Sequence, residues 1–127
     1  MIYSYQNLLV WKKAMDLVTD VYDCTRKYPP EEKFNLVDQM RRAAVSIPSN
    51  VAEGRDRGSD KDFIRFLLIA RGSCAELQTQ IIISYGQGYL NDCSKESLIK
   101  QCFEVNNLLS KFINKLKCDN NLSLYQI

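Results

Sequence analysis

The sequence contains no histidine, and this absence removes much of the chemistry that active sites commonly use. Histidine is the usual general base, the partner of Ser and Cys nucleophiles, and a ligand in many zinc sites. Without it no Glu-x-x-His metal site can form. No ligand spacing recurs between predicted helices among Glu31, Glu32, Glu53 and Glu76. We therefore expect no catalytic residue, no metal site and no cofactor.

Long apolar runs and paired cysteines are also lacking. No stretch approaches the roughly 18 uncharged apolar residues of a membrane span, and the N-terminus lacks the pattern of a signal peptide. The cysteines are odd in number and show no C-x-x-C spacing: Cys24, Cys74, Cys93, Cys102 and Cys118. This pattern does not resemble a disulfide framework or a cysteine-only zinc site. We expect reduced thiols and a cytoplasmic protein.

The rest of the composition is that of an ordinary globular domain. The chain has 127 residues, of which 46% are hydrophobic and 25% are charged, so we expect one domain over residues 1–127. Its 17 basic and 15 acidic residues leave a net charge of only +2. That balance excludes a strongly polycationic arm for binding nucleic acid.

Five glycines and three prolines sit in clusters and divide the chain into four segments with helical apolar periodicity. We predict helices at about 8–27, 32–53, 60–85 and 95–117, followed by a tail at 118–127. Four helices with short connections predict an all-α, antiparallel up-and-down four-helix bundle. Pro48 lies inside the second helix and is expected to kink it.

Local signals predict where these helices begin and end. Asn7 is a candidate N-cap for the first helix. Gly54 is expected to end the second helix, and residues 55–59 to form the turn. Ser59 and Asp62 resemble a capping box at the start of the third helix.

The second helix carries the most distinctive motif, QMRRAAVSIPSNVAEG at residues 39–54. This run resembles the signature of the four-helix bundle proteins that are described as 23S ribosomal RNA intervening-sequence proteins. The resemblance includes LVWKKA at 9–14, ARGS at 70–73 and ELQTQ at 76–80, and covers about residues 8–117.

The resemblance implies a bacterial, all-α bundle that assembles as a ring-shaped homopentamer. A related group with a similar fold comprises accessory proteins of diversity-generating retroelements. Those proteins bind nucleic acid through a basic surface and partner a reverse transcriptase. The family brings no catalytic residues to carry over.

At about 100° per residue, the polar positions of the motif fall on one narrow stripe beside the apolar face. The motif residues to which we assign a mainly structural role are Gln39, Arg42, Ser46, Pro48, Asn50, Glu53 and Gly54. The stripe suits a hydrogen-bond network in which Arg42 pairs with Glu53 or with a neighbouring helix. Alternatively, Arg42, Ser46 and Asn50 grip a phosphate, although Glu53 would repel it.

Basic residues are dense around the turn between the second and third helices. The nucleic-acid candidates are Arg41, Arg42, Arg55, Arg57, Lys61, Arg65 and Arg71. Acidic residues in the same stretch reduce its net positive charge. Residues 95–117 carry a further local excess of lysine. A solvated helix face also explains such a run.

The third helix shows two apolar stripes where an outer helix of a lone bundle normally has one. The second stripe lies about 120° from the first and comprises Ile64, Leu68, Ala75 and Ile82. These residues are candidates for an oligomer interface. The alternative is one wide stripe covered by the tail or by residues 1–5.

Together these patterns predict a non-enzymatic homo-oligomer that binds structured RNA or DNA through basic residues. The alternative is a protein–protein interaction scaffold that binds no nucleic acid. The possible partners are further copies of this chain, RNA or DNA, and a reverse transcriptase or another protein. No membrane partner is expected.

Overall fold

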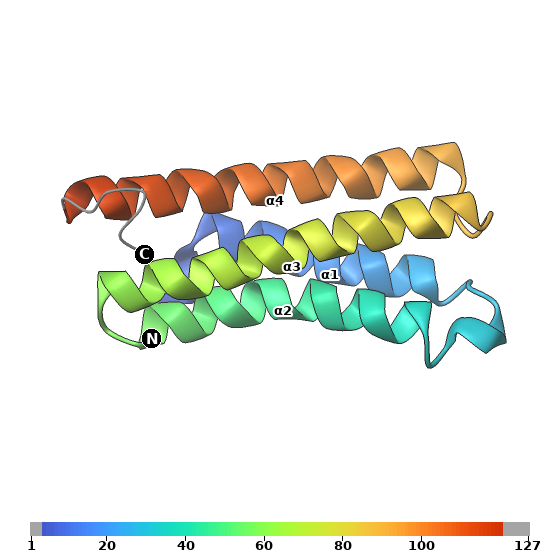
Figure 1. Ribbon diagram of the computed structural model, residues 1–127, viewed down its shortest axis with the longest axis horizontal. Helices are drawn as coiled ribbons and strands as arrows, with labels where there is room; N and C mark the ends of the chain where they lie inside the picture. The colour runs from blue at the N-terminus through green and yellow to red at the C-terminus, as the bar shows by residue number, and fades with distance from the viewer. Residues whose placement is uncertain (1–3, 121–127) are drawn as a thin grey trace.

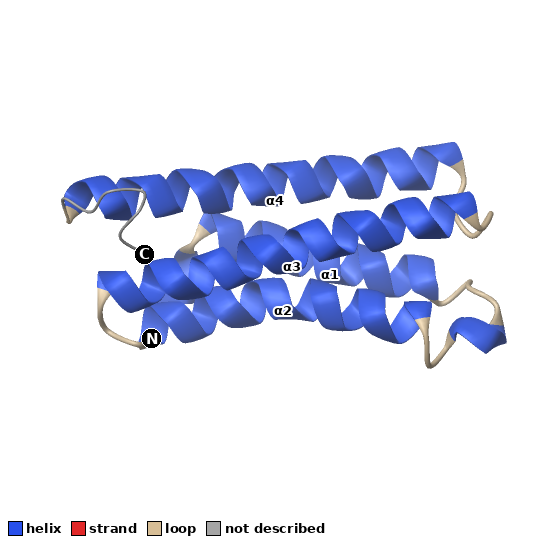
Figure 2. Ribbon diagram, in the orientation of Figure 1, coloured by secondary structure: helices blue, strands red, loops and turns tan. Residues whose placement is uncertain are grey.

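The computed structural model describes residues 4–120, and no strand occurs within that range (Figure 2). In chain order the elements are η1 (Ser4–Asn7), α1 (Leu9–Thr25), η2 (Pro30–Glu32), α2 (Leu36–Asp56), α3 (Asp60–Gly86) and α4 (Asp92–Asp119), where η denotes a 3₁₀ helix.

The four long helices lie side by side, and successive helices run in opposite directions (Figure 1). Helices α1 and α3 are each adjacent to both α2 and α4, so that among the described residues α1 lies diagonally opposite α3 and α2 lies diagonally opposite α4. This arrangement confirms the predicted all-α up-and-down four-helix bundle.

The core runs along the axis of the bundle because each helix buries one apolar face. Leu17, Met40, Leu77 and Leu109 are fully buried and come from four different helices. Cys74 and Cys102 belong to this core, and the Cys74 Sγ donates a hydrogen bond to the Cys102 carbonyl oxygen at 3.2 Å. All five cysteines are free thiols.

Two expected helix starts differ from the observed ones. Helix α2 begins at Leu36 rather than near residue 32, because Pro30–Glu32 form a separate 3₁₀ turn and Asn35 has a non-helical backbone (φ −127°, ψ −105°). Helix α4 begins at Asp92 rather than 95, since the Asn91 side chain caps it by accepting from the Ser94 N–H at 2.7 Å.

The ends of two helices also differ. Helix α2 continues to Asp56, so Gly54 lies inside the helix and the left-handed turn residue is Gly58 (φ +88°). Helix α4 extends through Asp119, so the expected tail begins later than residue 118. Residues 121–127 of that tail lie outside the described range.

At the other termini the outcome is mixed. Asn7 does not cap α1, because it belongs to η1 and the N-cap position is Leu8, whose side chain cannot accept a hydrogen bond. Ser59 does cap α3, accepting from the Asp62 N–H at 3.2 Å. Helix α2 remains helical on both sides of Pro48, which is buried. Within residues 4–120, no helix is long and apolar enough to cross a membrane.

Candidate nucleic-acid interface

The basic residues around the α2–α3 turn lie at one end of the bundle (Figure 1). Arg55 belongs to the last turn of α2, Arg57 follows that helix, and Lys61 and Arg65 lie in the first turns of α3. All four side chains are exposed. Because the turn is short, residues from two helices meet on one surface.

Two phenylalanines position three of these arginines. The Arg57 and Arg65 guanidinium carbons lie 4.9 and 5.5 Å from the centre of the Phe66 ring. The Arg55 guanidinium carbon lies 5.7 Å from the centre of the Phe63 ring. Phe63 and Phe66 are themselves buried. The stacked guanidinium groups are therefore held close to the protein rather than extended into solvent.

Acidic neighbours reduce the charge of this surface. Arg57 pairs with Glu53 at 2.8 Å, and Arg65 pairs with Asp62 at 3.0 Å. Residues 53–65 contain four basic and four acidic side chains, so the segment is neutral by itself. Exposed pairs of this kind contribute at most about 1 kcal/mol each to stability.

Helix α4 supplies the positive charge that the turn lacks. A groove of about 510 Å³ is lined by Arg55 from α2 and by Lys111 and Lys115 from α4. Phe112 and Leu116 form part of its apolar lining, and Asp60 and Asp119 also border it. Residues 105–118 contain three lysines and no acidic residue. The sequence showed this lysine excess, but only the fold brings it beside Arg55.

The remaining basic candidates do not join this surface. Arg71 is half-buried, and its Nη1 donates to the Ser110 Oγ at 3.3 Å across α3 and α4. Arg41 and Arg42 precede Arg55 by about 20 Å of helix, at 1.5 Å per residue. Arg42 is exposed and pairs with Asp38 at 2.9 Å. The seven candidates therefore do not form one patch, although they are close in sequence.

The centre of the family motif forms a small polar network between α2 and α3. The Ser46 and Ser73 hydroxyl oxygens are 2.8 Å apart, and the Asn50 Nδ2 donates to the Ser46 carbonyl and hydroxyl oxygens at 2.7 and 2.9 Å. The expected pair between Arg42 and Glu53 is wrong, because each binds a residue four positions away along its own helix. Gln39 is exposed.

Gly54 explains how α2 and α3 approach each other so closely. The residue is buried, and a Cβ at this position would lie 2.6 Å from the Phe66 Cβ and 3.1 Å from the Phe63 Cδ1. Any side chain would push the two helices apart. The same contact holds the phenylalanines on which the arginines stack.

The candidate interface stripe on α3 divides into buried and exposed members. Ile64 is fully buried in the core, so its expected outward position is wrong. The apolar face of α3 is wider at this level because both α2 and α4 pack against it. Leu68 is half-buried, Ala75 is exposed and Ile82 is 56% exposed. Ile69 and Ile83 of the same helix are also exposed, but Ile69 lies about 140° around the helix axis from Ile82 and is not part of this stripe.

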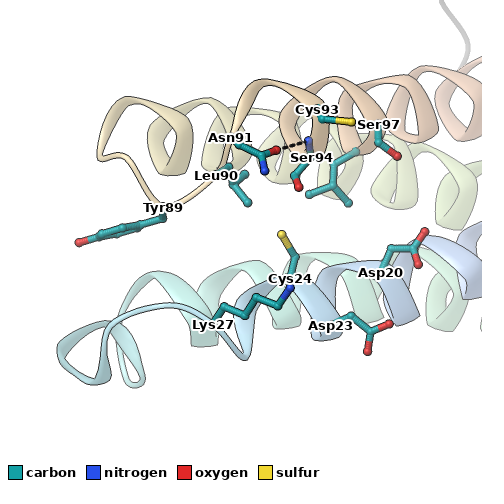
Figure 3. Close-up of a pocket in the computed structure, with 11 residues that line it drawn as sticks. Asp20, Asp23, Cys24, Lys27, Tyr89, Leu90, Asn91, Cys93, Ser94 and Ser97 are labelled. Carbon is teal, nitrogen blue, oxygen red and sulfur yellow. Dashed lines mark hydrogen bonds between the residues drawn. The ribbon is translucent and has the colours of Figure 1, made fainter.

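A pocket of about 480 Å³ lies at the opposite end of the bundle, between the end of α1 and the start of α4 (Figure 3). Asp20, Asp23, Cys24 and Lys27 line it from one side. Burial raises the pKa of the Cys24 thiol, which opposes formation of a nucleophilic thiolate. Within the described residues, no group of His, Cys, Asp or Glu is arranged to hold a metal ion.

Comparisons with known proteins identify the type of bundle. The family model described as 23S rRNA-intervening sequence protein matches residues 6–111. A solved structure of a protein with unknown function from the S23 ribosomal protein family of Bacteroides thetaiotaomicron is similar, with 25% identity and a TM-score of 0.78. The match covers 84% of this chain and 96% of that one. None of the curated proteins matches the chain.

Proposed function

The chain belongs to the 23S rRNA-intervening sequence protein family, and from that premise we propose that it is a non-enzymatic protein that binds structured RNA or DNA. The observation that carries the proposal is the groove in which Arg55 meets Lys111 and Lys115. Cations from two helices line one groove there, so that one folded nucleic acid could bind them through several phosphates.

The stacked arginines support this proposal further. Arg57 and Arg65 lie beside Phe66, so guanidinium groups continue from the groove to the α2–α3 turn, where each is paired with a carboxylate. Phosphates that displace Glu53 and Asp62 would bind guanidinium groups that are already positioned. The absence of histidine and of any recurring carboxylate pair supports a binding role rather than a catalytic one.

We propose in addition that the chain assembles as a cytoplasmic, bacterial homo-oligomer, most simply the pentameric ring that the family resemblance implies. Leu68, Ala75 and Ile82 on α3 support this assembly, since apolar side chains on an outer helix suit burial against a neighbour. Repetition of a weak basic surface around a ring would strengthen nucleic-acid binding through effective concentration.

The contact in such a ring is heterologous, so two different faces of the subunit must meet. A second apolar groove, of about 330 Å³, lies between α1 and α2 and is lined by Met15, Val45 and Pro48 among others. Met15 is 40% exposed and Val45 is 39% exposed. We propose that this groove receives the α3 face of the next subunit.

The nucleic-acid proposal is tested by replacing Arg55, Arg57 and Arg65 together with Ala. Each phosphate contact contributes roughly 0.7 to 0.9 to the slope of log K against log salt concentration. The triple variant should bind structured RNA more weakly, and the magnitude of its slope should fall by about two to three. Gel-shift titrations at several salt concentrations measure both quantities.

A matched control replaces Lys12, Lys13 and Lys100 with Ala. All three side chains are exposed, and none of them lines the groove of Arg55, Lys111 and Lys115 or stacks on Phe63 or Phe66, so the net charge changes equally while the proposed surface is kept. An equal loss of slope in both variants would show only a non-specific charge effect and would contradict the proposal.

The second candidate function is an interaction scaffold without nucleic acid, with a reverse transcriptase or another protein as partner. The exposed side chains of Ile82 and Ile83 favour it, because neighbouring apolar groups at one end of α3 suit burial against another protein. Retention on heparin and a salt-dependent RNA shift support the nucleic-acid proposal. Their absence, with intact assembly, supports the scaffold.

A further inference from the structure

A separate basic pocket is lined by residues from the end of α1, from η2 and from the start of α2. These segments lie at the end of the bundle opposite to the α2–α3 turn (Figure 1). Its volume is about 270 Å³, which suits a small group rather than a large ligand. Three cationic residues line it, Arg26, Lys33 and Arg41, and no acidic residue of the described chain does.

Arg41 is the fixed element of this pocket. Its Nε donates to the Thr25 Oγ1 at 2.9 Å, and its Nη2 lies 3.5 Å from the Tyr22 carbonyl oxygen. Its guanidinium carbon also stacks 4.5 Å from the centre of the Tyr22 ring. Thr25 is buried and donates its own proton to the Val21 carbonyl oxygen at 2.7 Å, so it accepts from Arg41 in a fixed orientation.

These partners of Arg41 are all neutral. Among residues 4–120, Arg41 forms no ion pair, although it is half-buried. Arg42, Arg57 and Arg65 each pair with a carboxylate on the surface. A partly desolvated guanidinium that is held in place without a counter-charge is prepared to bind an anion.

The charge of the pocket selects the kind of anion. Arg26 pairs with Asp23, so the three cations retain a net charge of about +2. A carboxylate or a phosphodiester carries one negative charge, whereas a phosphate monoester carries about −1.5 to −2 at pH 7. The groove near Arg55 is less suited to a compact dianion, because Asp60 and Asp119 border it.

We propose that the pocket formed by Arg26, Lys33 and Arg41 binds a phosphate monoester as its dianion. Arg41 supplies directional hydrogen bonds from a fixed position, and Lys33 supplies a second positive charge from the pocket lining, with its Nζ 5.3 Å from the centre of the Phe34 ring. This site lies at the opposite end from the proposed nucleic-acid surface and does not depend on it.

The test is a calorimetric titration of the full chain with inorganic phosphate at constant ionic strength. We expect saturable binding that chloride does not reproduce. Arg41→Gln should weaken it by about tenfold, as expected for the loss of a charged hydrogen-bond donor. Arg42→Gln is the matched control, because this neighbouring side chain is exposed, paired with Asp38 and absent from the pocket.

Lys33→Ala is a second pocket variant, which tests the proposal even if Arg41→Gln has a folding defect. Lys33 is exposed and lies outside the core, so this change should leave unfolding unaltered while weakening phosphate binding several-fold. Binding of equal strength in the parent protein and in both pocket variants would overturn the proposal. So would a titration without saturation.

The pH dependence tests the charge state of the ligand. A nucleoside monophosphate gains its second negative charge as pH rises past about 6, so its affinity should increase between pH 5.5 and 7.5. Sulfate is a dianion throughout this range and serves as the reference, with little change expected. Nucleotide binding that does not strengthen relative to sulfate would contradict a preference for the dianion.

Two further binding experiments distinguish which type of molecule presents the phosphate group to the pocket. A 5′-phosphorylated oligonucleotide is compared with its 5′-hydroxyl form, and a nucleoside monophosphate is titrated alone. If the 5′-phosphate increases the affinity of the oligonucleotide and the increase depends on Arg41, the ligand is the end of a nucleic-acid strand. If the mononucleotide binds equally well, the ligand is a small phosphate ester. No gain in either experiment overturns the site, while the Arg55, Arg57 and Arg65 variant still tests the nucleic-acid proposal independently.

Discussion

Gly54 is the residue at which the α2–α3 contact is tightest, and its replacement by Ala tests that contact. The added Cβ would lie 2.6 Å from the Phe66 Cβ, an atom fixed to the α3 backbone, so the helices must separate. Overpacking costs about 1–3 kcal/mol, against about 1 kcal/mol gained in helix propensity. We expect a net loss of up to about 2 kcal/mol in the free energy of unfolding, measured by urea denaturation.

Gly86→Ala is the control for this prediction. It adds the same methyl group at the end of α3, where nothing lies within 4 Å, so stability should be unchanged or slightly higher. If Gly54→Ala proved as stable as Gly86→Ala, the close approach of the two helices would not be the reason for the glycine.

Single residues also show why the candidate site was only partly predictable. Arg41 and Arg55 belong to one dense run of charge in the sequence, yet they lie at different ends of α2 and contact different helices. A helix advances about 1.5 Å per residue, so the 14 positions between Arg41 and Arg55 place them about 20 Å apart along α2. A count of charged residues in the sequence does not show this separation. The position of Lys111 beside Arg55 depends on how α4 packs, which no local pattern encodes.

At the scale of the helix, Pro48 is the feature of α2 that packing must compensate. Proline lacks the N–H that would bind the Ala44 carbonyl, and it costs about 3 kcal/mol in an unstrained helix interior. Pro48→Ala restores that hydrogen bond but removes part of a buried ring. We expect the subunit to gain about 1–2 kcal/mol in unfolding free energy, because the cavity offsets part of the gain.

The same substitution should weaken assembly, since Pro48 lines the α1–α2 groove proposed to receive a second subunit. Denaturation curves and sedimentation of the same samples measure both effects. Gln39→Ala is the control, because this residue of α2 is exposed and does not line the groove, so its replacement should change neither by much. A Pro48→Ala protein with a lower melting temperature and intact oligomers would contradict both parts of the argument.

The boundaries of the helices were predictable where a local side chain sets them. Ser59 caps α3 through its own hydroxyl, and that signal is visible in four residues of sequence. The start of α2 was not predictable in the same way, because Asn35 breaks the helix by its backbone conformation and makes no side-chain cap. The prediction that Gly54 ends α2 was wrong for a physical reason, because the lack of a side chain at this position allows close packing between helices and does not mark a turn.

At the scale of the whole molecule, the apolar periodicity was sufficient to predict the bundle but not which apolar residues face outward. Ile64 and Ile82 share one sequence stripe, yet Ile64 is enclosed between neighbouring helices and Ile82 is 56% exposed. Helix α2 packs against one side of α3, and α4 packs against another. The buried part of its surface is therefore wider near Ile64 than a single stripe predicts.

The exposed part of that surface gives the test of assembly. Ile82→Glu places a charge on the α3 face, and burial of an unpaired carboxylate in a subunit contact is strongly unfavourable. We expect the parent protein to sediment as an oligomer at micromolar concentration and the variant to sediment as a helical monomer. Circular dichroism verifies that the helices persist, as expected for a change at an exposed site.

Phe103→Glu on α4 is the matched control, because Phe103 is also 56% exposed and lies outside both the α3 face and the α1–α2 groove. Its oligomers should remain intact, which would separate the loss of one specific contact from a general effect of added charge. Dissociation by Phe103→Glu but not by Ile82→Glu would place the subunit contact on α4 instead. A parent protein that is already monomeric would remove the assembly proposal, and with it the expected strengthening of nucleic-acid binding around a ring.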